Sequence, residues 1–82
     1  MSVTLLHDAG PFRRGASFRT LDWAISAHSD VWPNNSRWLW QSRGQSHRVK
    51  VVGGVPVRDD GAVLHTNSSR YEWRYRAGKS GK

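Results

Sequence analysis

Residues 37–76 read RWLWQSRGQSHRVKVVGGVPVRDDGAVLHTNSSRYEWRYR, and apolar side chains alternate with polar ones along much of this stretch. Successive side chains of a β-strand point to opposite faces of a sheet, so an alternation with a period of two predicts strands. Turns rich in glycine, asparagine and aspartate separate four predicted strands, which cover residues 37–42, 47–52, 62–66 and 70–76. We therefore expect an antiparallel meander, in which neighbouring strands follow one another along the chain.

A short segment between the second and third of these strands has a weaker pattern. Gly53-Gly54 lies between two apolar runs, which is a strong signal for a two-residue hairpin turn. The next residues, 55–58, read VPVR and include Pro56, whose nitrogen cannot donate a hydrogen bond to a neighbouring strand. We expect residues 55–58 to form an edge or bulged strand at best, which would be the fifth strand of the sheet.

The N-terminal half contains one predicted helix, at about residues 20–29. Its apolar stripe has a period of 3.6 residues and consists of Leu21, Ala24, Ile25 and His28. Thr20 is a suitable N-cap residue, and Asp22 suits the positive end of the helix dipole. Residues 2–7 alternate weakly and predict one further short strand.

These elements predict an α+β fold, with one helix packed on a four- to five-stranded antiparallel meander sheet. The alternative is a small SH3-like β-barrel, closed by the N-terminal strand. A chain of 82 residues has room for one domain. We expect that compact domain to cover residues 1–76, followed by a flexible basic tail over residues 77–82.

The alternation sorts the side chains of the three strongest strands onto two faces. The aromatic face would carry Trp38, Trp40, Val49, Val51, Tyr71, Trp73 and Tyr75. In so short a chain these side chains would supply most of the core; the alternative is that some of the rings stack on the bases of a nucleic acid. Trp23 and Trp32 lie off the helix stripe, so we expect them to be partly exposed.

The charge of the chain is distributed unevenly along its length. The net charge is +7, yet residues 1–36 sum to zero, with three Arg against three Asp. Residues 37–82 contain ten Arg and Lys residues against three acidic residues, so the whole excess lies there. Segregated charge attracts polyanions, whereas a sheet selected for stability alone would alternate its signs. The alternative is that the excess charge only maintains solubility.

We therefore predict a small, basic, non-enzymatic protein that binds nucleic acid, DNA or RNA, through the basic face of its sheet. Arginine suits this role because its planar fork pairs with two phosphate oxygens. The candidate binding residues are Arg37, Arg43, Arg48, Lys50, Arg70, Arg74, Arg76 and Lys79. The size and charge would suit a regulator encoded by a phage or mobile element.

Two other functions are compatible with the same composition. The first is a protein-binding modulator or inhibitor, which would dock its basic, tryptophan-rich surface on an acidic partner. The second is a small metal-independent ribonuclease, in which His47 and His65 would meet on or near the apolar face and act as general acid and base. We expect no cleavage and assign no catalytic residue.

The absence of cysteine excludes disulfides and thiolate metal sites, and it is typical of a reducing, cytoplasmic compartment. The four histidines do not have the spacing of a helical metal site, so we predict no metal and no cofactor. No apolar run approaches the roughly 18 residues that span a bilayer, and we expect no membrane partner. A homodimer is compatible with so small a core.

Overall fold

The computed structural model describes residues 1–29, 31–67 and 69–75. Seven strands form one antiparallel sheet: β1 Ser2–Leu5, β2 Ser17–Arg19, β3 Arg37–Ser42, β4 Gln45–Val52, β5 Val55–Arg58, β6 Val63–Asn67 and β7 Arg70–Arg74. One α-helix, α1 (Thr20–Ser26), continues into a short 3-10 helix, η1 (Ala27–Ser29). Within the described residues, neither helix has the length and apolar content needed to cross a membrane.

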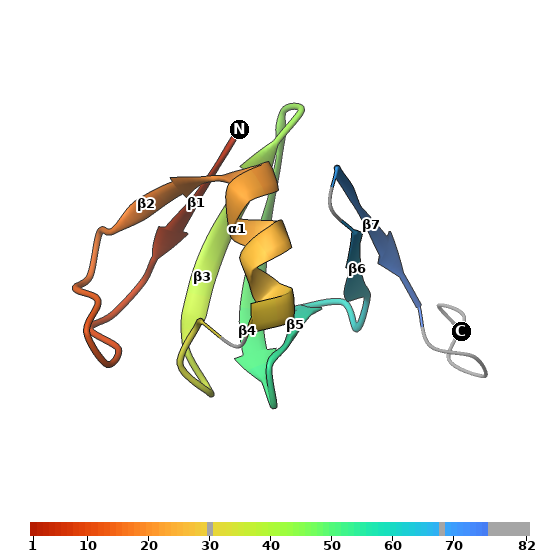
Figure 1. Ribbon diagram of the computed structural model, residues 1–82. Helices are drawn as coiled ribbons and strands as arrows, with labels where there is room; N and C mark the ends of the chain where they lie inside the picture. Colours follow the sequence, from red (N-terminus) through yellow and green to blue (C-terminus); the bar gives the residue numbers. More distant parts are fainter. Residues whose placement is uncertain (30, 68, 76–82) are drawn as a thin grey trace.

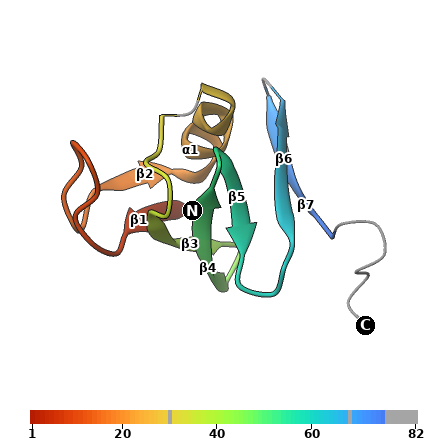
Figure 2. The same cartoon turned by 90° about the horizontal axis from the view of Figure 1, so that it is seen from below.

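The sheet is a curved meander with the helix on its concave side. The strand order is β2-β1-β3-β4-β5-β6-β7, so the last five strands follow one another along the chain. The helix α1 contacts β2 near one edge of the sheet and β7 at the other, so the sheet curls around it (Figure 1). Seen from below, α1 lies between β2 and the β6–β7 hairpin (Figure 2). The prediction of one helix packed on an antiparallel meander is confirmed.

The sheet has seven strands, rather than the predicted four or five. The N-terminal strand β1 pairs with β3, and β2 pairs with the other side of β1. The sequence does not predict β2, because Ser17–Arg19 is too short to show a period; it is held by β1 and by the packing of Phe18 against the core. In the described chain β2 and β7 do not pair, so the sheet is open and the barrel alternative is wrong.

The strand that contains proline, β5, is internal, which corrects the prediction of an edge strand. It pairs with β4 over four residues, from Val55 to Arg58. On its other side it pairs with β6 at one position, Val57 opposite Val63. The absence of an N–H at Pro56 is tolerated because this second ladder is so short. Gly53 and Gly54 form the predicted turn, with φ values of 58° and 81° that favour glycine.

The core between α1 and the sheet consists mainly of aromatic rings. Trp23 is fully buried, stacks on Trp32 at 5.6 Å between ring centroids, and meets Trp38 and Trp40 edge-on at 5.4 and 5.9 Å. The expected partial exposure of Trp23 and Trp32 is therefore wrong, since 0% and 6% of their surfaces are exposed. The helix buries Thr20, Trp23 and Ala24, one residue out of step with the predicted stripe, because the indole ring gains more from burial than Leu21 does.

The boundaries of α1 also differ from the prediction. The α-helix ends at Ser26, and the last three residues of the predicted range adopt the tighter 3-10 conformation. Arg19 is the N-cap residue in place of Thr20, and no side chain caps the helix. The hydroxyl of Thr20 is oriented instead toward β7, where it accepts a hydrogen bond from the Tyr71 hydroxyl at 3.4 Å.

The alternation of the strands is largely confirmed. Buried residues on β3 and β4 are the predicted Trp38, Trp40, Val49 and Val51. On β7, Tyr71 and Trp73 are half-buried against this core. The predicted burial of Tyr75 is wrong, since 47% of its surface is exposed. Tyr75 lies beyond the end of β7, and its hydroxyl donates a hydrogen bond to Asp60 Oδ2 at 2.8 Å.

Candidate nucleic-acid interface

Three cationic side chains gather on the outer face of the sheet, the face that points away from α1. Arg37 on β3 lies directly opposite Lys50 on β4, and Arg48 lies opposite Leu39 two positions along. Opposite residues of an antiparallel pair point to the same face, with Cβ atoms about 4.5–5.5 Å apart. All three cations are exposed. We refer to Arg37, Arg48 and Lys50 as the basic cluster.

The backbone that carries the basic cluster is firmly held. Strands β3 and β4 pair over six residues, the longest pairing in the sheet. The Arg37 N–H donates to His7 Nε2 at 3.0 Å, and the Arg37 carbonyl accepts a hydrogen bond from the Leu6 N–H at 3.0 Å. The three side chains therefore project from a fixed platform, and only their own torsions need to be ordered when a ligand binds.

No carboxylate neutralises the basic cluster within the described part of the chain. The two ion pairs among residues 1–29, 31–67 and 69–75 are Arg58–Asp60 and Arg74–Glu72. Like charges directly opposite on neighbouring strands destabilise a sheet. The pair Arg37–Lys50 is such an arrangement, and packing does not require it because both side chains are exposed.

The other predicted binding residues are distributed over different places. Arg43 lies in the β3–β4 turn with a φ of 54°, and Arg70 begins β7. Arg74 donates two hydrogen bonds to Glu72 Oε1, at 2.9 and 3.1 Å, so a partner already balances its charge. Arg76 and Lys79, like the predicted tail, lie outside the described residues.

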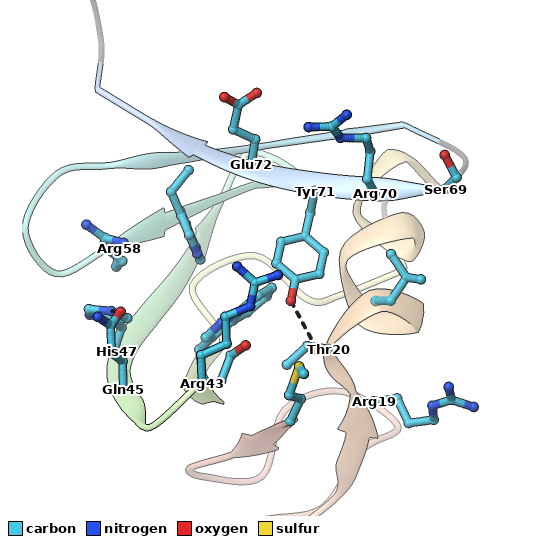
Figure 3. Close-up of a pocket in the computed structure, with 15 residues that line it drawn as sticks. Arg19, Thr20, Arg43, Gln45, His47, Arg58, Ser69, Arg70, Tyr71 and Glu72 are labelled. Atoms are coloured by element: carbon cyan, nitrogen blue, oxygen red, sulfur yellow. Dashed lines mark hydrogen bonds between the residues drawn. The ribbon is translucent and has the colours of Figure 1, made fainter.

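A cleft of about 940 Å³ lies on the concave side, near the first turn of α1 (Figure 3). Residues of the β3–β4 hairpin form one wall, among them Arg43 and His47, and β7 forms the other with Tyr71 and Trp73. Figure 3 shows Tyr71 pointing from β7 into the space between the walls, with Arg43 directed toward it from below. Arg70 lies at the rim, on the opposite side of β7 from the Tyr71 ring.

The cleft exists because the sheet splits between β4 and β6. Strand β4 pairs with β5 only from Val49 onward, and the Arg48 carbonyl accepts one further hydrogen bond from the Asp59 N–H, so residues 45–47 pair with β3 alone. Strand β6 pairs with β5 only at Val63, so residues 64–67 pair with β7 alone. The β3–β4 and β6–β7 hairpins therefore diverge, and their free ends form the two walls.

A polar cluster joins β5, its turn and the end of β7. The Arg58 guanidinium donates to both carboxylate oxygens of Asp60, with a distance of 2.8 Å from Nε to Oδ1, and its Nη2 donates to the Tyr75 hydroxyl at 3.2 Å. The Arg58 guanidinium carbon also lies 5.3 Å from the centre of the Trp73 ring. The hydrogen bonds from Arg58 hold the pKa of the Asp60 carboxyl well below its ordinary value, and those to Asp60 raise the pKa of Arg58.

This cluster predicts a specific dependence of stability on pH. A carboxylate with a depressed pKa stabilises the fold above its ordinary pKa of 3.8 and loses that contribution as the pH falls further. We expect wild type to melt higher than Asp60→Asn above about pH 4, with the difference shrinking toward about pH 2. Because the Asp60 side chain is 41% exposed, solvent screening keeps the effect to a few degrees at most.

The measurement is a melting temperature at a series of pH values at low salt. Asp59→Asn is the matched control, because Asp59 lies in the same turn and makes no ion pair in the described chain. A constant difference between wild type and Asp60→Asn from neutral pH down to pH 2 would show that the carboxylate charge contributes nothing.

The two histidines that were expected to meet lie on opposite faces of the sheet. His47 is opposite Trp40 and lines the cleft, where its Nε2 is 3.4 Å from Gln45 Oε1. His65 is exposed and opposite Glu72, between the inward-facing Leu64 and Thr66. The expectation that both histidines lie on or near the apolar face is wrong for His65. The register of β6 would have to shift by one residue to bring the His65 side chain to that face.

Sequence reasoning overlooked the cleft and two arginines beside it, Arg19 and Arg58. Arg19 precedes α1 in the half of the chain that has no net charge, so charge counting gives it no weight. Arg58 is opposite the buried Val49 and therefore shares its concave face. The alternation in residues 55–58 carries this signal, since Arg58 is two residues from the buried Pro56.

Comparisons with protein-family models, with curated proteins and with solved structures find no match to this chain. No cluster of three or more potential metal ligands occurs among the residues that the structure describes. The basic cluster and the cleft are therefore the features of this chain that bear on its function.

Proposed function

We propose that this protein binds nucleic acid without catalysing a reaction, and that the basic cluster on β3 and β4 contacts the phosphates. One observation carries the proposal: Arg37, Arg48 and Lys50 project from adjacent strands to one face, with no carboxylate paired to them in the described chain. Neighbouring phosphates along a nucleic acid present a matching row of negative charge.

The charges of the basic cluster have opposite effects in the free protein and in a complex. In the free protein Arg37 and Lys50 repel each other, at a cost of a few tenths of a kcal/mol. In a complex each cation replaces a counterion of the phosphate backbone, and the released counterions favour binding. The same arrangement is unfavourable for the isolated fold and favourable for the complex, which supports a polyanion as the ligand.

The decisive experiment is a binding titration with short duplex DNA, single-stranded DNA and single-stranded RNA at about 50 and about 150 mM salt. We expect binding at low salt that weakens steeply as salt rises, with a slope of log K against log salt of about −0.9 for each phosphate contacted on duplex DNA. An acidic protein partner would be indicated instead if all three nucleic acids bound weakly and equally and none bound at the higher salt.

Arg48→Ala should weaken duplex binding severalfold and flatten the salt slope by about one unit. Arg48 is exposed on the outer face, so the substitution should leave the melting temperature nearly unchanged. The matched control is Arg13→Ala, which removes another exposed arginine, from a loop that precedes β2. Equal effects of the two substitutions would mean that net charge alone, and not the basic cluster, determines the affinity.

A further inference from the structure

We propose that the cleft on the concave side is a site for single-stranded nucleic acid, distinct from the basic cluster on the outer face. Its bases would pack against Tyr71 and Trp73, and its phosphates would lie at the mouth, near Arg43 and Arg70. This inference rests on the proposed function and specifies which form of nucleic acid the protein prefers. Three features of the cleft support it: the aromatic wall, the charge at the mouth and the size.

The aromatic wall is held in place by the core. The rings of Tyr71 and Trp73 are half-buried and meet the buried Trp40 edge-on, at 4.9 and 5.1 Å between ring centroids. The Tyr71 hydroxyl is anchored on Thr20 at 3.4 Å. Both rings line the cleft, so the parts of the rings that the core and, for Trp73, the Arg58 guanidinium leave uncovered face the open space. Rings that are fixed in this way bind a base with little loss of side-chain freedom.

The free charge at the mouth of the cleft is positive. Arg43 and Arg70 are exposed, come from opposite walls, and have no acidic partner in the described chain. The two charged residues of the walls that do have partners are Arg58, paired with Asp60, and Glu72, paired with Arg74. Glu72 and Arg70 both lie at the rim in Figure 3, on the side of β7 opposite to Tyr71, and Arg74 already balances the charge of Glu72. A phosphate backbone that lies along the mouth therefore meets two unpaired guanidinium groups.

The size and the chemistry of the cleft favour a single strand over a duplex. A volume of about 940 Å³ is at the upper end of the range for small-molecule sites and accommodates a few nucleotides. A double helix is too wide to enter, and its base faces are covered by their neighbours in the stack. A single strand can turn its bases toward aromatic side chains, and such stacking tolerates any sequence.

Tryptophan fluorescence tests this directly, because only one of the five tryptophans is more than marginally exposed. Trp23, Trp32, Trp38 and Trp40 are buried, whereas Trp73 is half-buried in the wall of the cleft. We expect single-stranded oligothymidine and oligouridine to quench the emission in a saturable way, and a duplex to quench it little. Trp73→Phe should remove most of the quenching and lower single-strand affinity about fivefold. Trp32→Phe should show the quenching and the affinity of the wild-type protein.

Two charge variants separate the cleft from the basic cluster. Arg43→Asn keeps a residue that tolerates positive φ, and Arg70→Gln keeps an exposed polar side chain. Each should weaken single-strand binding about threefold or more and leave duplex binding unchanged, with Arg14→Gln as the control for charge. Circular dichroism and melting temperature establish that each variant is folded.

The outcomes distinguish this inference from the proposed function. Duplex binding that depends on Arg48, without quenching by single strands, would overturn the cleft site and leave the basic cluster intact. Equal losses of single-strand and duplex affinity in Arg43→Asn and Arg70→Gln would also overturn it. A wild-type protein that binds no nucleic acid at low salt would overturn both proposals.

Discussion

Replacement of Trp23 by alanine is expected to remove a large part of the free energy of unfolding of the protein. Trp23 has no exposed surface and contacts the rings of Trp32, Trp38 and Trp40, so its removal leaves a cavity at the centre of the core. Truncation of a large buried aromatic side chain costs about 3–5 kcal/mol. A chain of 82 residues has a total stability of about 4–12 kcal/mol, so the loss is at least about a quarter of it and, at the lower end of the range, all of it.

Trp23→Phe is the matched control for this experiment. The Trp23 Nε1–H is buried and has no hydrogen-bond partner among the described residues, so phenylalanine removes a polar group that the core does not satisfy. We expect urea unfolding, followed by circular dichroism, to show that Trp23→Phe retains most of the stability that Trp23→Ala loses. A Trp23→Ala protein with the wild-type midpoint would show that the aromatic cluster does not determine the stability of this fold.

Replacement of Lys50 by glutamate is expected to raise stability and lower nucleic-acid affinity at the same time. The substitution converts the repulsive pair Arg37–Lys50 into an attractive one across β3 and β4, which should stabilise the sheet by about 0.2–1 kcal/mol. It also removes one cation from the proposed phosphate site and adds a repulsive charge, so affinity at about 50 mM salt should fall about tenfold or more. Opposite signs of the two changes are characteristic of a residue retained for binding rather than for folding.

Melting temperatures and binding titrations on the same preparations measure both effects. Arg13→Glu changes the net charge by the same amount in an exposed loop and serves as the control. It should reduce affinity much less than Lys50→Glu and should not raise the melting temperature. If Lys50→Glu binds duplex DNA as tightly as wild type, the basic cluster is not the phosphate site.

The strands of the sheet could be predicted from the sequence where they are long and bury only one of their two faces. In β3 and β4 the alternation of Trp38, Trp40, Val49 and Val51 with polar residues specified both the strands and the buried face. The alternation gives no signal at β2, because Ser17–Arg19 contains a single apolar residue, Phe18. Strands of three residues depend on their partners in space, and a local pattern cannot show them.

The helix face shows a different limit. Leu21 and Ile25 lie on one side of α1 and Trp23 on another, so two overlapping apolar stripes compete. The sequence gives no means to choose between them, because the choice depends on the shape of the space beneath the helix. In the structure the rings of Trp32, Trp38 and Trp40 surround Trp23, so the side of α1 that carries Trp23 faces the core.

Charge patterning predicted part of the candidate site. Arg37, Arg48 and Lys50 share a face because they alternate with buried residues in two paired strands. Arg43 was predicted on the same basic face, but it lies in a turn with positive φ, where the alternation of faces stops, and it lines the cleft instead. The cleft depends on where β4 and β6 lose their common neighbour β5, which is a property of the whole sheet.

The aromatic core has an entropic consequence for a chain without cross-links. Each buried tryptophan removes about 150–250 Å² of surface from water, yet freezes only two side-chain torsions. Trp23, Trp38 and Trp40 therefore contribute much burial for little lost rotamer freedom, whereas the long side chains of Met, Lys or Arg lose more torsional freedom on ordering. A core of stiff rings lowers the entropic cost of folding because few side-chain torsions are lost in the native state. A disulfide lowers the same cost in another way, by restricting the unfolded chain. That is one physical reason why a chain of 82 residues that has no cysteine can form a defined core.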